Sequence, residues 1–334
     1  GAITTAGGNI MIGVDTGLQL TTGANNVAIG SSAMRQNDGT PSENVAIGYI
    51  AMYEGTGDYN VAVGKGALRT TDGNYNVGVG YNSGINLTTG QDNTLLGAKS
   101  GDTITTGSRN LAIGYAALDN ADTESDNIAI GYDALGGSVN GAEYTVAIGN
   151  YTLDALTSGD NNTAVGHNSA TAVTTGNHNT AIGSYAYFRA TDGVYNVVTG
   201  YLSGGGLRSG SYNVVMGFNT MNQVNNDGDY NVAIGTHAMQ AATGNDVNNN
   251  TAIGTSALQS ITEGASNIAL GYQAGNNITS GDNNVVIGGA DVSSATGSDQ
   301  LSISSGDGGV TWITGDSNGG IASKGQVVTV SSGT

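Results

Sequence analysis

The sequence has no cysteine, one proline, one tryptophan and two phenylalanines among its 334 residues. The absence of cysteine excludes disulfide scaffolds, thiolate metal sites and cysteine nucleophiles. Only 8 residues are Lys or Arg against 26 Asp or Glu, and the formal charge of −18 would repel a phosphate backbone. We therefore expect no nucleic-acid partner. Because no run of 18 apolar residues is present, we also expect no membrane insertion.

Glycine is the residue in excess, with 57 copies. A single proline, Pro41, and the lack of a three-residue glycine period exclude collagen. The glycines interrupt the chain too often to leave room for helices of ordinary length. The sequence therefore predicts an all-β protein with minimal helical content.

The glycines belong to a repeat in which Asn, three mostly apolar residues and Gly form a pentad. The pentad occurs seventeen times at spacings of 16 to 19 residues, with Thr145 in place of Asn in one copy. Representative pairs of the first and last pentad residue are Asn26 and Gly30, Asn44 and Gly48, Asn110 and Gly114, Asn179 and Gly183, and Asn231 and Gly235. Such a unit is typical of one coil of a solenoid whose coils stack through strand pairing. We predict a parallel β-solenoid or β-roll of about seventeen 17-residue coils.

Each column of the repeat has its own expected role. The closing Gly makes a corner, and a second Gly three residues before most Asn residues makes another. Between Asn and Gly, alternation sends the two outer apolar residues to one side and the small middle residue to the other. Stacked Asn side chains should form a hydrogen-bonded ladder. Because so thin a coil buries little core, we expect the alanine side of the strand to pack against another chain in an oligomer.

The repeat ends before the chain does. We assign residues 1–288 to a repeat shaft and residues 289–334 to a C-terminal β cap, which contains the only tryptophan, Trp312. Within the cap, the segment from Gln300 to Ser304 has the pattern of a decayed eighteenth strand.

The pentad at Asn26–Gly30, Asn44–Gly48 and Asn231–Gly235 resembles the head repeat of trimeric autotransporter adhesins, which form homotrimeric β-rolls. The longer units at Thr105–Leu118 and Thr174–Tyr187 are more similar to repeats of tailed-phage tail fibres. The resemblance covers about nine tenths of the chain. It implies a homotrimeric fibre, located in the virion or, as the alternative, on a cell surface.

Residues that break the repeat are few, and they are the candidates for chemistry. His167, His178 and His237 are interpreted as polar corner residues. Carboxylates cluster at Asp119, Asp122, Glu124 and Asp126 and at Asp227 and Asp229, as paired acids do in glycosidases. Coils of uniform length offer no cleft wall, and no calcium-loop motif is present. We expect no catalytic residue, cofactor or metal, with a structural calcium left as an alternative.

Tyrosine is the one abundant aromatic residue, with 16 copies. Five that follow the closing Gly are candidates for binding a receptor surface: Tyr49, Tyr115, Tyr132, Tyr201 and Tyr272. The alternative is an aromatic ladder that packs at the corners or across chains. Adjacent threonines argue against an ice-binding array, because alternation turns one of each pair inward.

These observations favour a non-catalytic structural fibre, specifically a phage tail-fibre shaft that mediates host attachment. Its expected partners are copies of itself, other tail or fibre proteins, and a glycan or protein of the host surface. A bacterial adhesin or extracellular filament and a polysaccharide-cleaving spike are the alternatives.

Overall fold

The computed structural model describes residues 7–36, 40–223, 227–244, 246–323 and 326–327. These residues contain strands, turns and bends but no helix, which confirms the all-β prediction. The chain divides into two compact units, Gly1–Thr175 and Gly176–Thr334. Both units contain repeats, so this division lies within the predicted shaft rather than at its predicted end near residue 288.

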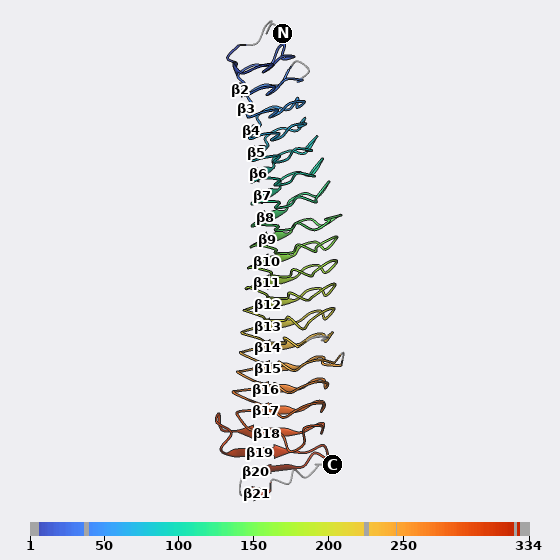
Figure 1. Cartoon of the computed structure of the whole chain (residues 1–334). Helices are drawn as coiled ribbons and strands as arrows, with labels where there is room; N and C mark the ends of the chain where they lie inside the picture. Colours follow the sequence, from blue (N-terminus) through green and yellow to red (C-terminus); the bar gives the residue numbers. More distant parts are fainter. Residues whose placement is uncertain (1–6, 37–39, 224–226, 245, 324–325, 328–334) are drawn as a thin grey trace. The chain divides into compact units, whose positions relative to one another are not determined.

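The first unit is a stack of coils, each with one three-residue strand. Within this unit, successive strands pair in parallel, with equivalent residues opposite each other. Figure 1 shows these strands one beneath another. They are β1 (Ile10–Ile12), β2 (Val27–Ile29), β3 (Val45–Ile47), β4 (Val61–Val63), β5 (Val77–Val79), β6 (Thr94–Leu96), β7 (Leu111–Ile113), β8 (Ile128–Ile130), β9 (Val146–Ile148) and β10 (Thr163–Val165).

The second unit repeats this parallel pairing and then changes direction. Its coils carry β11 (Thr180–Ile182), β12 (Val197–Thr199), β13 (Val214–Met216), β14 (Val232–Ile234), β15 (Thr251–Ile253), β16 (Ile268–Leu270) and β17 (Val285–Ile287). The predicted eighteenth strand is confirmed, because β18 (Leu301–Ser304) pairs in parallel with β17. It is followed by β19 (Thr311–Gly315), β20 (Ile321–Ser323) and β21 (Gln326–Val327), which pair antiparallel in sequence order. We call β18 to β21 the meander.

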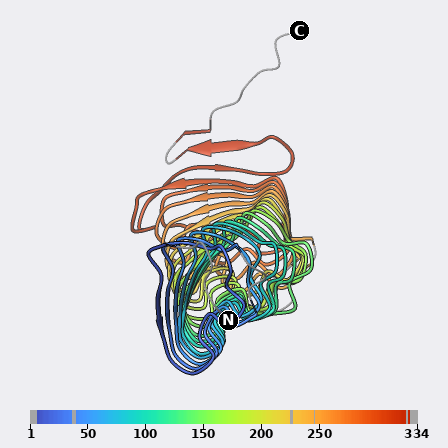
Figure 2. The ribbon, with the colours of Figure 1, turned by 90° about the horizontal axis from the view of Figure 1, so that it is seen from above.

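The two units together confirm a parallel β-solenoid of about seventeen coils. Seen from above in Figure 2, the successive coils within each unit follow similar paths. Strands occupy only three residues of each coil, but stacking also continues through the turns. In the turn after β2, for example, the amide of Met34 donates to the carbonyl of Ala51 in the next coil at 3.0 Å.

The interior of each coil is filled by small and medium side chains. The middle strand residue, such as Ala28, Ala46 or Ala233, is buried, as are the Ala and Leu or Met of the following turn, such as Ala67 and Leu68. The expectation that the alanine side packs against another chain is therefore wrong. Alanine points inward because it is the middle residue of the strand, and the Val and Ile residues on either side of it point outward. Larger middle residues, such as Leu95 and Val215, are buried at the same position in other coils.

The two corner glycines are required for different reasons. The closing glycine Gly183 has a φ of 132°, and a Cβ there would lie 2.6 Å from the carbonyl oxygen of Gly200 in the next coil. The second corner glycine Gly73 lacks a positive φ, but a Cβ on it would collide with the carbonyl oxygen of Gly90. Close backbone approach between coils is thus common to both corners, whereas positive φ is the rule at the first and the exception at the second, as at Gly264 with a φ of 110°.

Left-handed backbone also occurs at residues other than glycine, which the sequence did not predict. In one coil, Leu68 and Tyr75 have φ values of 45° and 60°. Their amides donate to carbonyls of adjacent coils, Leu68 to Ser83 at 2.9 Å and Tyr75 to Asp58 at 3.2 Å. Stacking therefore holds these residues in a conformation that costs an isolated L-residue roughly 1–2 kcal/mol.

The predicted asparagine ladder is confirmed. The side-chain oxygen of Asn213 accepts hydrogen bonds from the backbone amide of Asn231 at 2.8 Å and from its side-chain amide at 3.1 Å. The side-chain oxygen of Asn231 accepts the same two bonds from Asn250. The Asn231 side chain also donates to the carbonyl of Val247 at 2.7 Å. Each buried Asn thus links strand and corner of adjacent coils. In the meander, Gln300 takes the same position and bonds to Asn284.

A second ladder runs two residues before the asparagines and was not predicted. Its side chains accept backbone amides of the preceding coil, as Asp58 does from Ser42 at 2.7 Å and Asp229 does from Ser211 at 2.7 Å. The sequence signal was a preference for Ser, Asp or Asn at this position. Part of the acidic excess therefore has a structural role in coil stacking.

Candidate interaction surface

The outward residues of the strands, which are partly or fully exposed, form an apolar surface in each unit. We define the apolar face as the first and third residues of strands β1 to β17. Every one of these positions carries Val, Ile, Leu, Met or Thr, and none carries a charge, although the whole chain has 34 charged residues (26 acidic and 8 basic). Ile182, Ile268 and Leu270 are 42%, 46% and 47% exposed. Continuous exposed apolar surfaces of this kind mark interaction sites in soluble proteins.

Aromatic side chains border the apolar face on both sides. One column lies at the residue before the ladder Asn and the other at the residue after the closing Gly. In one coil of the first unit, Tyr75 and Tyr81 occupy these two positions and are 55% and 47% exposed, with Val77 and Val79 between them. Where both columns are occupied, one aromatic side chain therefore lies on each side of the apolar face.

Many of these rings stack on the equivalent ring of the next coil. Tyr59 and Tyr75 have ring centroids 5.0 Å apart and planes inclined by 8°. In the second unit, Tyr195 stacks on Tyr212 at 5.1 Å, and Tyr212 stacks on Tyr230 at 4.9 Å. Stacked rings cover one another's faces and present their edges to solvent.

The five candidate binding tyrosines are all exposed, but only some of them stack on another aromatic ring. Tyr115 and Tyr132 stack on each other at 5.3 Å, and Tyr201 stacks on Phe218 at 5.7 Å. Tyr49 and Tyr272 have no ring partner among the described residues. Because a sugar stacks on the face of an aromatic ring, Tyr49 and Tyr272 are the two whose geometry suits glycan contact best. Receptor binding by the five residues stays a prediction.

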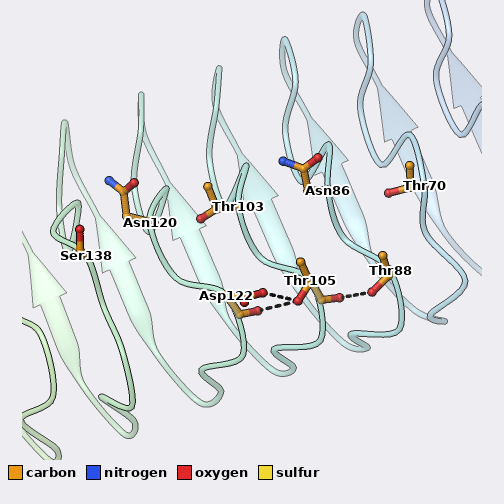
Figure 3. Close-up of a pocket in the computed structure, with 8 residues that line it drawn as sticks. All are labelled: Thr70, Asn86, Thr88, Thr103, Thr105, Asn120, Asp122 and Ser138. Atoms are coloured by element: carbon orange, nitrogen blue, oxygen red, sulfur yellow. Dashed lines mark hydrogen bonds between the residues drawn. The ribbon is translucent and has the colours of Figure 1, made fainter.

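A groove of about 590 Å³, lined by Thr, Asn, Asp and Ser residues, lies along the turns of the first unit. Figure 3 shows its two rows of side chains, one containing Thr88, Thr105 and Asp122 and the other containing Asn86, Thr103 and Asn120. The Thr88 hydroxyl donates to the carbonyl of Thr105 at 2.9 Å, and the Thr105 hydroxyl donates to Asp122.

The other row of the groove also bonds to neighbouring coils. Asn86 donates to the carbonyl of Asp102 at 2.7 Å, and Thr103 donates to the carbonyl of Ala121 at 2.8 Å. These groups hold adjacent coils together rather than converging on a reacting atom, as catalysis would require.

The clustered carboxylates near the groove have separate partners. Asp126 pairs with Arg109 through two contacts of 2.7 Å, which lowers the pKa of its carboxyl group. Glu124 is buried and accepts the backbone amides of Asp122 and Gly141, each at 2.8 Å.

Asp119 differs from these acids because partial burial, followed by repulsion from Asp102 and Asp133, raises the pKa of its carboxyl group to about 6. Within the ranges that the structure describes, no group of three His, Cys, Asp or Glu residues is arranged to hold a metal ion.

Two of the histidines occupy the aromatic columns, because His178 precedes the ladder residue Asn179 and His167 follows the closing glycine Gly166. His178 stacks on Tyr195 with ring centroids 4.7 Å apart, and His237 packs against Phe218 at 5.6 Å. His167 packs edge-on against Tyr151 at 6.4 Å. These imidazoles thus take part in ring packing.

No protein-family model matches the chain, and neither the curated proteins nor the solved structures contain a significant match. In the part of the chain that the structure describes, no helix could cross a membrane.

Proposed function

We propose that the protein is a non-catalytic fibre subunit that assembles with copies of itself through the apolar face. The observation that carries this proposal is the absence of charge from every outward strand position in a chain of net charge −18. Charged groups are depleted at the centres of protein interfaces, because desolvating them is costly. The acidic residues lie instead on corners and ladders, where they stay solvated or bonded to the backbone.

A second copy of the chain fits this face better than an unrelated partner. The outward columns repeat at the spacing of the coils, so a matching surface must repeat at the same spacing over many coils. A copy of the chain meets that condition by construction, and like columns can then interdigitate without bringing like charges together. That the assembly contains three copies is inferred from the resemblance of the repeat to those of trimeric adhesin heads and tail fibres.

Solution mass tests the assembly. We expect light scattering during size-exclusion chromatography to give about 100 kDa, three times the 33.2 kDa chain. Ile253 and Leu270 lie opposite each other on β15 and β16, and both point outward. Changing both to Lys should shift the protein towards the monomer, because unpaired charges would be buried in the interface.

The matched control places the same two charges away from the face. Ser209 and Thr262 are exposed corner residues of the second unit, so Ser209→Lys with Thr262→Lys should leave the mass unchanged. Circular dichroism of both variants establishes that the coils remain folded. A folded wild-type monomer, or equal dissociation of both variants, would contradict assembly through the apolar face.

We further propose that the fibre is a phage tail-fibre shaft serving host attachment. Its support is the resemblance of the repeat and the near-uniform coils, which suit a spacer more than a catalyst. Immunogold electron microscopy with antibodies to the chain tests this assignment. Label on phage tails is the expected result, whereas label on the envelope of uninfected bacteria would favour an adhesin. Sugar release from a capsule or lipopolysaccharide panel would instead indicate a polysaccharide-cleaving spike.

A further inference from the structure

Three exposed tyrosines in the second unit, in the column before the ladder asparagines, form a continuous ring stack beside the apolar face. Tyr195, Tyr212 and Tyr230 are 47%, 46% and 56% exposed. Their neighbouring rings are inclined by only 13° and 5°. We propose that this column is a site of oxidative tyrosine coupling, where a one-electron oxidant joins rings of adjacent coils by a carbon–carbon bond.

The backbone keeps the three rings together. All three residues have left-handed φ values of 56° to 60°. The amide of Tyr212 donates to the carbonyl of Val194 at 2.9 Å, and that of Tyr230 donates to Ser211 at 3.1 Å. Each tyrosine is thus held in its coil next to the same residue type in the adjoining coil. Such fixed proximity raises the effective concentration of one ring at the next far above that of free phenols.

The coupling step balances with a peroxidase and hydrogen peroxide as oxidant. Each of two phenols loses one electron and one proton, giving two tyrosyl radicals. The radicals combine through the ring carbons next to the hydroxyl-bearing carbon, and each coupled ring then moves its displaced hydrogen to the phenol oxygen. Overall, two tyrosines lose two electrons and two protons, and one hydrogen peroxide becomes two waters.

The product would tie one coil covalently to the next. Tyr195 and Tyr212 are 17 residues apart, and Tyr212 and Tyr230 are 18 apart, so each bond closes one turn of the solenoid. The first unit has the same arrangement at Tyr59 and Tyr75, with centroids 5.0 Å apart. Coupling within columns would strengthen a fibre without altering the apolar face.

The experiment treats the full chain with a haem peroxidase and hydrogen peroxide and identifies linked peptides by mass spectrometry. Cleavage after Arg208 and before Asp227 and Asp229 puts the three tyrosines on separate peptides. We expect peptides linking Tyr212 to Tyr195 and to Tyr230, together with dityrosine fluorescence. Tyr212→Phe should abolish both links, because Tyr195 and Tyr230 then lie two coils apart.

Tyr272→Phe is the matched control, because Tyr272 is exposed but has no ring partner among the described residues. It should leave both links and the fluorescence yield unchanged. Linked peptides that join Tyr272 as often as Tyr212, or links found only between chains on denaturing gels, would overturn the proposal. The solution mass of the same samples reports assembly independently, so failure of coupling is distinguishable from failure of the proposed oligomer.

Discussion

The coils of the second unit and the meander that follows them are built from similar residues but are held together differently. In the coils, the ladder hydrogen bonds join residues of neighbouring coils, as between Asn231 and Asn250, which are 19 positions apart. In the turns of the meander, they join near neighbours: Asp307 accepts the amide of Gly309 and Asp316 accepts those of Asn318 and Gly320. The middle residues of the coil strands are buried, whereas Trp312 in β19 is 52% exposed.

This difference shows where the stability of the fold resides. A coil residue contacts its equivalents in both neighbours, so one substitution disturbs three coils. The side-chain hydrogen bonds of a meander turn lie within the turn, so a substitution at an open position there should disturb only that turn. Substitutions of the same type should therefore have large effects in the coils and small effects in the meander.

The largest contrast is expected for glycine. Gly183→Ala would place a Cβ 2.6 Å from the carbonyl oxygen of Gly200, at a φ of 132° that alanine rarely adopts. Backbone strain and overpacking together should cost about 3–5 kcal/mol or prevent folding. Chemical denaturation followed by circular dichroism measures the loss.

Gly306→Ala is the matched substitution in the meander. No atom lies within 4 Å of a Cβ at Gly306, and its φ is not positive. The expected change is within about 0.5 kcal/mol, since such a site gains or loses little beyond chain entropy. Equal destabilisation by the two alanines would contradict the contrast between coil and meander.

Asparagine gives the next largest contrast. Asn231→Ala removes the acceptor of the Asn250 amides and the donor to Val247, all of them in the interior. Buried polar groups left without partners should lower the free energy of unfolding by about 3 kcal/mol. Asn318→Ala in the exposed meander turn keeps the backbone bond to Asp316, so urea denaturation should detect little change. A small change in the free energy of unfolding for Asn231→Ala would show that water satisfies the groups that Asn231 otherwise bonds.

The period of the pentad was enough to predict the fold, because stacking in register requires a residue of each type at each level. The asparagine ladder and the closing glycines were predictable for the same reason. Which residues of each strand point into the coil and which point outward was not predictable. Both Ala28 and Val27 suit a buried position, and only the path of the backbone through the coil places the middle residue, Ala28, inside.

The surface was less predictable than the interior. The tyrosine columns were visible in the sequence, but the stacking of Tyr212 on Tyr230 and the free faces of Tyr49 and Tyr272 depend on ring orientation, which spacing does not determine. Left-handed φ values at Leu68 and Tyr75 had no sequence signal, since neither residue favours them. They follow from hydrogen bonds to adjacent coils.

The smallest contrast concerns acids. The carboxyl pKa of Asp119, a coil residue, is raised to about 6 from 3.8. The folded state therefore holds this proton more tightly than the unfolded state, and stability declines as pH rises from about 4 to about 6. Asp119→Asn should remove that decline and stabilise the protein at pH 7, by about 1 kcal/mol after allowance for solvent screening at this half-buried group. Thermal unfolding between pH 3 and pH 8 tests this.

Asp307 in the meander should show the opposite sign. Hydrogen bonds from the Ser305 hydroxyl and the Gly309 amide lower the pKa of its carboxyl group below 3.8. Its contribution is therefore present above pH 3.8 and lost as the pH falls through the lower folded value. Asp307→Asn should flatten only the acid end of the stability profile, and slightly, because the group is exposed. If both variants changed the profile in the same direction, the acids of coil and meander would share one environment, contrary to the contacts that distinguish them.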